Sequence, residues 1–230
     1  MHRQSKEWGA VANRAVGIDL GAKALHVVVL ERAARQPRVK FQVVDTAVVM
    51  PEEDEVLLAL CTDAQAIAID APSDPSTKPH AGDLSLSPKF RVARCGEIAL
   101  GQDHGSWVPW VTPESVDASP PWMQVGFRVF QRLRTAGHQP LEVYPSGAFR
   151  VLALARLPKK STVAGRHARL EVLQRDIELS DVAKIWGHDT IDAAVAALVA
   201  AWSVTEGPVV AARHDQPGCD DSAIWIPVRA

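Results

Sequence analysis

The chain has 230 residues, of which 47% are hydrophobic, and this suits one large domain or two small ones with a substantial core. Lysine and arginine total 25 against 27 for aspartate and glutamate, so the formal net charge is −2 and the chain lacks the basic excess typical of nucleic-acid binding, although a local basic patch is compatible with it. The first residues contain no apolar signal-peptide core, and no apolar window approaches the roughly 18 residues of a membrane span, which favours a cytoplasmic protein that does not cross a membrane.

Residues 1–14 are polar, and we expect a flexible N-terminus ahead of a single domain over residues 15–230. Three β-branched runs separated by short polar gaps then predict strands joined by hairpins, at residues 15–20, 24–31 and 38–46. A helix is predicted over residues 51–61, where proline and acidic residues precede apolar positions. The short apolar run at residues 66–70 is typical of a buried parallel strand.

Residues 71–120 are rich in proline and show no sustained period, so we expect an irregular insert, which in a compact domain is usually functional. Periodicity then predicts, in order, a helix over 122–137, a strand over 140–145, helices over 146–157, 164–178 and 187–203, and a strand or tail over 223–228. A meander of strands followed by alternating helices and strands predicts an α/β fold, with a mixed sheet between helices.

The three cysteines, Cys61, Cys95 and Cys219, are odd in number and widely spaced, and the chain contains no C-x-x-C motif. We therefore expect reduced, buried thiols rather than a disulfide framework or a zinc site.

Three predicted strands each carry one acidic residue at or near the C-terminal end, namely Asp19, Asp70 and Glu142. A strand-end aspartate that starts a turn is common, and each residue taken alone fits that structural role. A carboxylate in an apolar strand is nevertheless expensive unless it is paired, hydrogen-bonded or bound to a cation. Three such strands form a pattern, which indicates a carboxylate cluster.

Asp189 and Asp192 stand three residues apart at the start of the alanine-rich segment, so they share one face of the predicted helix. One interpretation is a helix cap, with Asp189 as the N-cap and Asp192 at N3. The other is a contribution to a metal site, because clustered carboxylates bind hard cations such as Mg²⁺ or Mn²⁺. Both roles can hold for one pair, and Asp192 is the stronger candidate ligand.

The β-β-β-α-β order, with these acids and a D-x-x-D pair opening a late helix, resembles the ribonuclease H-like superfamily. The segment DTIDAAVAALVA is similar to the helix of Holliday-junction resolvases, whose pattern is D-x-x-D-A-x-x-x-A. Over residues 16–227 the chain also resembles the uncharacterised domain family 429 (DUF429), whose members are predicted nucleases. The matching segments, in the family's order, are VGIDL, AIAIDAP, RVARCGEIAL, LEVYPSGAF, AGRHARLEVL, DTIDAAVAALVAAW and AIWIP.

The resemblance implies a ribonuclease H-like mixed five-stranded sheet, in which a three-strand antiparallel meander is followed by parallel strands and flanked by helices. It implies that Asp19 is the central ligand of Mg²⁺ or Mn²⁺ and that Asp70, Asp192 and Asp189 complete the metal site. Glu142 matches the acid of the family's E-x-Y-P motif and is a further catalytic candidate.

Arg94, Glu97, Arg166 and Arg169 also match family positions. For the arginines, one interpretation is a solvated helix face, and the other is bidentate contact with a substrate phosphate in a site that would otherwise repel polyanions.

The resemblance thus implies a nuclease that hydrolyses phosphodiester bonds in DNA or RNA with two carboxylate-bound metal ions. A role in cutting junctions would suggest a two-fold homodimer. Two alternatives stay open. The segment GIDLGAK also resembles the first phosphate loop of actin-like ATPases and sugar kinases, and a non-catalytic binding module could retain the same fold.

Overall fold

The structure is a computed structural model that describes residues 14–33, 41–205, 207, 209–212, 219 and 223–228. The predicted flexible N-terminus lies outside these residues, apart from Arg14, which begins the first strand. Within the described residues, no helix is long and apolar enough to cross a membrane.

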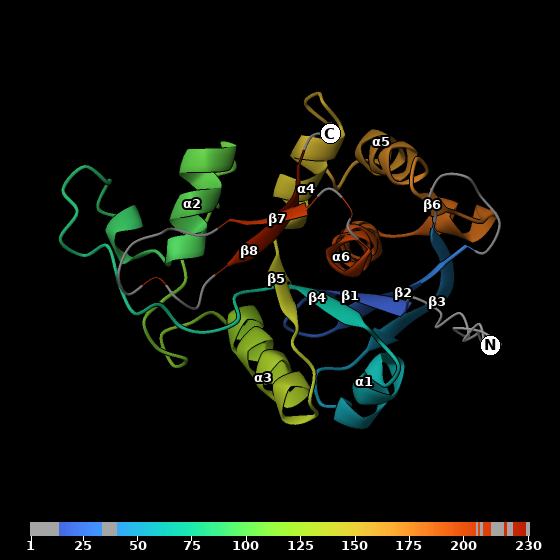
Figure 1. The fold of residues 1–230 in the computed structure, drawn as a ribbon, viewed down its shortest axis with the longest axis horizontal. Coiled ribbons are helices and arrows are strands. Elements are labelled where there is room, and N and C mark those ends of the chain that lie inside the picture. The colour runs from blue at the N-terminus through green and yellow to red at the C-terminus, as the bar shows by residue number, and fades with distance from the viewer. Residues whose placement is uncertain are drawn as a thin grey trace, which may run out of the picture.

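One mixed sheet of eight strands, counted over the described residues, runs through the molecule in the order β6-β3-β2-β1-β4-β5-β8-β7 (Figure 1). The strands are β1 (Arg14–Leu20), β2 (Leu25–Arg32), β3 (Phe41–Val49), β4 (Ala66–Asp70), β5 (Leu141–Val143), β6 (Ile177–Glu178), β7 (Val209–Ala212) and β8 (Ile224–Pro227). The first three form an antiparallel meander, and β4, β5 and β8 continue the sheet in parallel with β1.

The predicted mixed α/β sheet is confirmed, but the expectation of five strands is wrong. The extra strands extend the two edges of the sheet: β6 pairs with β3, while β8 and β7 follow β5. β6 has two residues and β7 has four, which is too short for an alternating pattern to stand out in the sequence.

Helices cover both faces of the sheet (Figure 1). They are α1 (Asp54–Cys61), α2 (Cys95–His104), α3 (Pro121–Thr135), α4 (Pro145–Leu152), α5 (Val163–Leu173) and α6 (His188–Val204), with short 3₁₀ helices η1 (Phe90–Val92) and η2 (Asp181–Ile185). One core joins the sheet to α4, α5 and α6, and a second core joins the opposite face to α1 and α3. The helix α2 packs on β7 and β8. It lies in the segment predicted to be irregular, where Gly96 and Gly101 weaken the helical pattern.

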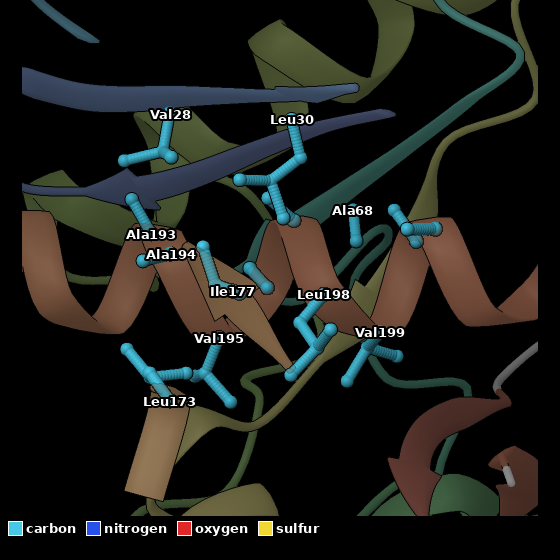
Figure 2. Packing of buried hydrophobic residues seen from close by; sticks show 14 of the residues in the cluster. Val28, Leu30, Ala68, Leu173, Ile177, Ala193, Ala194, Val195, Leu198 and Val199 are labelled. Carbon is cyan, nitrogen blue, oxygen red and sulfur yellow. The ribbon is translucent and has the colours of Figure 1, made fainter. Parts of the chain in front are cut away.

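The alanine-rich helix α6 lies directly against the centre of the sheet. Its residues 191–202 are all buried, and Figure 2 shows its side chains between Val28, Leu30 and Ala68 of the sheet on one side and Leu173 of α5 on the other. A Cβ added to Gly17 of β1 would lie 2.1 Å from the carbonyl oxygen of Ala193 and from the amide nitrogen of Ala197. The small residues of α6 and the glycine of β1 therefore permit a helix-to-strand contact closer than larger side chains would allow.

Side-chain alternation decides which strand residues face α6. In β4, Ala68 belongs to the core beneath α6 and Ile69 belongs to the core beneath α1 and α3. Asp70 continues this alternation, so its side chain points to the α6 face. Asp19 stands opposite Asp70 in the parallel register of β1 and β4, and it shares that face.

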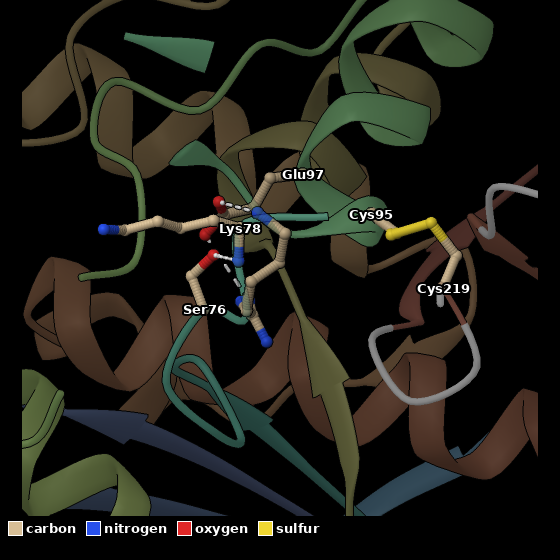
Figure 3. The surroundings of a disulfide bond; sticks show 6 residues. Ser76, Lys78, Cys95, Glu97 and Cys219 are labelled. Atoms are coloured by element: carbon tan, nitrogen blue, oxygen red, sulfur yellow. Dashed lines mark hydrogen bonds and ion pairs between the residues drawn. A yellow bond between two sulfur atoms is a disulfide. The ribbon is translucent and has the colours of Figure 1, made fainter. Parts of the chain in front are cut away.

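Two of the cysteines are joined. Cys95, at the start of α2, forms a disulfide with Cys219 (Figure 3). Cys61 is a buried free thiol. The expectation of three reduced thiols is therefore wrong for this pair. The two residues are 124 positions apart in sequence, and only the packing of α2 beside β7 and β8 brings their Cα atoms to 5.5 Å.

Candidate metal centre

Three aspartates converge at the C-terminal ends of β1 and β4. Asp19, Asp70 and Asp192, named here the aspartate cluster, each offer a carboxylate oxygen, and these oxygens all lie within 4.8 Å of one another. β1 and β4 contribute one residue each in direct register, and the first turns of α6 contribute Asp192. The side chains of Asp19 and Asp192 are buried, while Asp70 is partly exposed. The three aspartates that the sequence indicates as candidate ligands lie on three different elements, and the fold brings their carboxylates together.

Ionisation of all three carboxylates in the aspartate cluster is unfavourable. Burial, followed by the charge of Asp192, raises the pKa of Asp19 from 3.8 to about 7, although a hydrogen bond with Asp70 opposes the shift. Burial and the neighbouring Asp19 raise the pKa of Asp70 well above its usual range, and burial also raises the pKa of Asp192. Each of these shifts disfavours the charged form of the carboxylate. The positive charge of the neighbouring residues is therefore too small for all three carboxylates to be ionised at once.

Lys160 is a member of the site that the sequence did not indicate. Its ammonium group donates a hydrogen bond to Oδ2 of Asp192 at 2.5 Å. Burial alone would lower the pKa of Lys160, but the charge and hydrogen bond of Asp192, together with the charges of Asp19 and Asp70, outweigh it and the pKa is raised. Lys160 comes from the loop between α4 and α5, and no motif marks it. A Cβ on Gly165 would lie 1.9 Å from the carbonyl oxygen of Lys159, so this glycine allows the loop to pass close to α5.

The donor set fits a hard divalent cation. Oδ1 of Asp192 is buried and accepts no hydrogen bond from any residue that the structure describes. A buried carboxylate oxygen without a donor carries a desolvation penalty that a bound cation would remove. Carboxylates on three elements are the ligands that Mg²⁺ and Mn²⁺ prefer.

Asp189 stands apart from the aspartate cluster. The helix α6 begins at His188 with Gly187 as its N-cap, so Asp189 is the second helical residue and is not the predicted N-cap. Its carboxylate lies 3.1 Å from Nε2 of His188 and 3.8 Å from Nε2 of His26 on β2. The side chain is 39% exposed and still benefits from the positive end of the helix dipole. His26, which also contacts Thr190, was not singled out in the sequence because a histidine in a strand has no distinctive pattern.

Glu142 points away from the aspartate cluster. In the parallel register of β4 and β5 it stands opposite Ile69, and it therefore lies on the sheet face opposite to Asp70. The guanidinium of Arg94 binds both carboxylate oxygens of Glu142, with one distance of 2.8 Å, and the amide of Ser73 donates to Oε2 at 2.9 Å. Both side chains of this ion pair are buried.

Arg94 and Glu97 form the rest of this buried network. The carboxylate of Glu97 accepts hydrogen bonds from the backbone amide of Arg94 and from the hydroxyl of Thr112. Nε of Arg94 donates a further hydrogen bond to Oγ1 of Thr112 at 3.1 Å. Arg94 is 2% exposed, so in this conformation its guanidinium is out of reach of a substrate phosphate. The network instead fastens the insert, residues 71–120, to β5.

The two predicted arginines of α5 occupy different environments. Arg166 is partly exposed and donates to the carbonyl oxygen of Ser161. Arg169 lies over the ring of Phe149 and is close enough to Asp192 for the carboxylate to act on its pKa, although burial, the larger effect, lowers that pKa. Arg169 also lines an open cavity of about 600 Å³. Two further arginines that the sequence did not indicate, Arg150 and Arg156, line the same cavity.

Comparisons with known proteins agree with part of the predicted resemblance. The family model described as "Protein of unknown function (DUF429)" matches residues 120–216, which include Lys160 and Asp192 but not Asp19 or Asp70. Among solved structures, the chain is similar to the RuvC structure of Thermus thermophilus, with a TM-score of 0.44, and to T. thermophilus RuvC in complex with a Holliday junction substrate, with a TM-score of 0.43. Each comparison has 14% sequence identity and covers 84% of this chain and 96% of the other. No curated protein matches the chain.

Proposed function

We propose that this protein is a nuclease that depends on Mg²⁺ or Mn²⁺ and hydrolyses phosphodiester bonds in nucleic acid. The observation that carries the proposal is the aspartate cluster, in which three carboxylates from three elements lie within 4.8 Å of one another. The centre of the sheet, with its antiparallel meander followed by parallel strands, agrees with the arrangement that the ribonuclease H-like resemblance implies. A divalent cation bound there would make a water molecule more acidic and would offset the charge that builds up on phosphate during hydrolysis.

The chain's own side chains have distinct roles in this proposal. Asp19, Asp70 and Asp192 would hold the cation. Lys160 compensates Asp192, and because its side chain is 39% exposed it can turn toward a phosphate oxygen of the substrate. Arg169 and the other arginines of the adjoining cavity extend positive charge away from the cluster, which suits a polyanionic strand although the whole chain is slightly acidic.

Glu142 has a positioning role in this proposal. Its carboxylate is bound to Arg94 and to the amide of Ser73, which lies three residues after Asp70. Ser73 lies in the loop that follows β4, so Glu142 and Arg94 fix this loop next to the aspartate cluster. We therefore propose that Asp19, Asp70 and Asp192 bind the metal and that Glu142 and Arg94 only support the surrounding structure.

Metal binding is the first test, by calorimetric titration of the full chain with Mn²⁺. We expect the wild type to bind and Asp192→Asn to bind at least about 100-fold more weakly, because removal even of residues that only support metal ligands costs about 10- to 100-fold. Asp45→Asn is a matched control, since Asp45 is an exposed aspartate on β3. Failure of the wild type to bind would refute the metal assignment.

Cleavage is the second test, with Mn²⁺ and labelled DNA junctions, DNA duplexes and structured RNA. We expect cleavage by the wild type and by Asp45→Asn, and loss of cleavage in Asp19→Asn and Asp192→Asn. Mn²⁺ binding without cleavage of any substrate would instead support the non-catalytic binding module. Cleavage that survives both active-site substitutions would come from a contaminant or from another site, and would overturn the proposal.

A further inference from the structure

A second group of metal-ligating side chains lies outside the aspartate cluster. The imidazole of His80 and the sulfur atoms of Cys95 and Cys219, named here the cysteine cluster, all lie within 4.8 Å of one another, and all three residues are buried. Figure 3 shows the disulfide between Cys95, at the start of α2, and Cys219. His80 and Cys95 both belong to the insert, whereas Cys219 lies 124 positions after Cys95. The cluster therefore joins the insert to a residue from near the C-terminal end of the chain.

We propose that the cysteine cluster is a redox-controlled zinc site. When the disulfide is reduced, the thiolates of Cys95 and Cys219 and the neutral imidazole of His80 bind one Zn²⁺. Two thiolates and one imidazole are borderline-soft ligands, which select Zn²⁺ over the hard cations that carboxylates prefer. Two thiolate charges also neutralise the ion, so the occupied site places no net charge in the protein interior.

Cys95 and Cys61 occupy different places in the fold. Cys95 is the first residue of α2, where the positive end of the helix dipole lies. Cys61 is the last residue of α1 and is not a member of the cysteine cluster. Burial raises the pKa of the Cys61 thiol to about 12, so this cysteine stays protonated and provides a matched control.

His80 is held in place by the fold of the insert. Its side chain is 2% exposed, and its carbonyl oxygen accepts the amide of Asp83 at 2.9 Å, which closes a turn around it. A buried imidazole beside two sulfur atoms is shielded from competing water. The absence of a C-x-x-C motif argues against a zinc site made by one short segment, but it does not bear on a site that joins the insert to Cys219.

The disulfide and the zinc complex exclude each other, which makes the site a redox switch. A dithiol reductant attacks one sulfur through its thiolate, passes through a mixed disulfide, and leaves as its own cyclic disulfide. Two electrons and two protons thereby convert the S–S bond into two thiols. Zinc binding then releases both thiol protons. Thiol–disulfide exchange with a disulfide oxidant returns the site to its first state: the two thiolates pass two electrons to the oxidant, which leaves as two thiols after taking up two protons, the S–S bond between Cys95 and Cys219 reforms, and the ion is released.

The test uses the full chain reduced with a water-soluble phosphine, which takes its oxygen from water as it becomes a phosphine oxide and leaves two thiols. Thiol counting in denaturant verifies that all three cysteines are reduced. Zn²⁺ is then titrated, with Co²⁺ as a spectroscopic probe. We expect the reduced chain to bind one more Zn²⁺ than the oxidised chain, which keeps only the aspartate cluster, and to give a sulfur-to-cobalt charge-transfer band that the oxidised chain lacks.

Variants assign the ligands. Cys219→Ser should abolish the charge-transfer band, and His80→Asn should weaken zinc binding by about 10- to 100-fold. Cys61→Ser and Asp192→Asn should both still bind zinc at the cysteine cluster. The outcome for the cysteine cluster therefore does not depend on the aspartate cluster or on the proposed nuclease function. Circular dichroism checks that each variant is folded.

A measurement on the unmodified chain guards against variants that fail to fold. In the reduced wild type, Zn²⁺ should protect two of the three thiols from alkylation, and mass spectrometry should identify them as Cys95 and Cys219. Absence of zinc binding by the reduced wild type, alkylation that ignores zinc, or a charge-transfer band that persists in Cys219→Ser would each overturn the proposal.

Discussion

Asp19 is both buried and close to other carboxylates, and these two effects raise its pKa from 3.8 to about 7. It lies 7% exposed at the end of β1, beside two other carboxylates and with Lys160 as a more distant cation. A folded protein retains such a group when another function requires it, because an apolar residue would be cheaper at this position. The raised pKa also makes Asp19 a source of pH-dependent stability.

With metal removed by a chelator, Asp19 should destabilise the protein as pH rises. Its pKa is about 7 in the folded chain and near 3.8 when unfolded, so between these values the folded state holds a proton that the unfolded state has lost. The contribution is therefore fully present below pH 4 and disappears as pH passes 7. Thermal unfolding of Asp19→Asn provides the reference, because its side chain does not titrate.

We expect the melting temperature of the wild type to fall relative to that of Asp19→Asn between about pH 4 and pH 7, and added Mn²⁺ to restore it at pH 7 and above. Parallel pH profiles for the two proteins would show that Asp19 is ionised in the folded state throughout this range.

At the scale of elements, the contact between α6 and β1 positions the aspartate cluster. Gly17 is two residues before Asp19 on the same face of β1, and Ala193 directly follows Asp192 on α6. The close approach that places Ala193 over Gly17 also sets the distance between the two carboxylates. Packing and chemistry are therefore coupled through one helix-to-strand contact.

Gly17→Ala should disturb both stability and metal binding. The new Cβ would lie 2.1 Å from backbone atoms of α6, which cannot move as a flexible side chain would, and overpacking of this kind costs about 1–3 kcal/mol. Urea unfolding and Mn²⁺ titration measure the two effects. Gly82→Ala is the control, because a Cβ there meets no atom within 4 Å among the described residues. Equal stability of the two variants would contradict the proposed contact.

At the scale of the molecule, two linkages involve the insert. The buried pair of Arg94 and Glu142 fastens the insert to β5, and the disulfide joins α2 to Cys219. Removal of one partner from a buried ion pair is costly, because it leaves the other charge uncompensated. These linkages explain how a proline-rich insert remains attached to a compact domain.

Reduction of the disulfide with zinc chelated should lower the free energy of unfolding. The bond closes a loop of 124 residues, for which chain entropy gives up to about 5 kcal/mol. Denaturant unfolding with and without a phosphine reductant measures the difference. Cys219→Ser should not respond to the reductant, whereas Cys61→Ser should respond like the wild type. An unchanged midpoint in the wild type would show that the bond adds no stability.

Local patterns in the sequence were sufficient for most of the central elements. The strand predicted over residues 66–70 has the same limits as β4, and the alanine-rich segment forms α6 within one residue of its predicted limits. Short-range sequence features mark strand ends and helix starts. These features are enough to indicate Asp19, Asp70 and Asp192 as candidates. The short edge strands and the glycine-containing α2 lack such features and were missed.

Only the tertiary structure decided how these residues are grouped. The register of β4 against β5 places Glu142 on the face opposite to Asp70, and a shift of one residue would have reversed that outcome. Lys160 joins the aspartates, and Cys219 joins Cys95, through contacts between segments far apart in the chain. Sequence periodicity describes each segment relative to its own axis. It contains no information on which faces of different segments meet, and the chemistry of both proposed sites depends on that meeting.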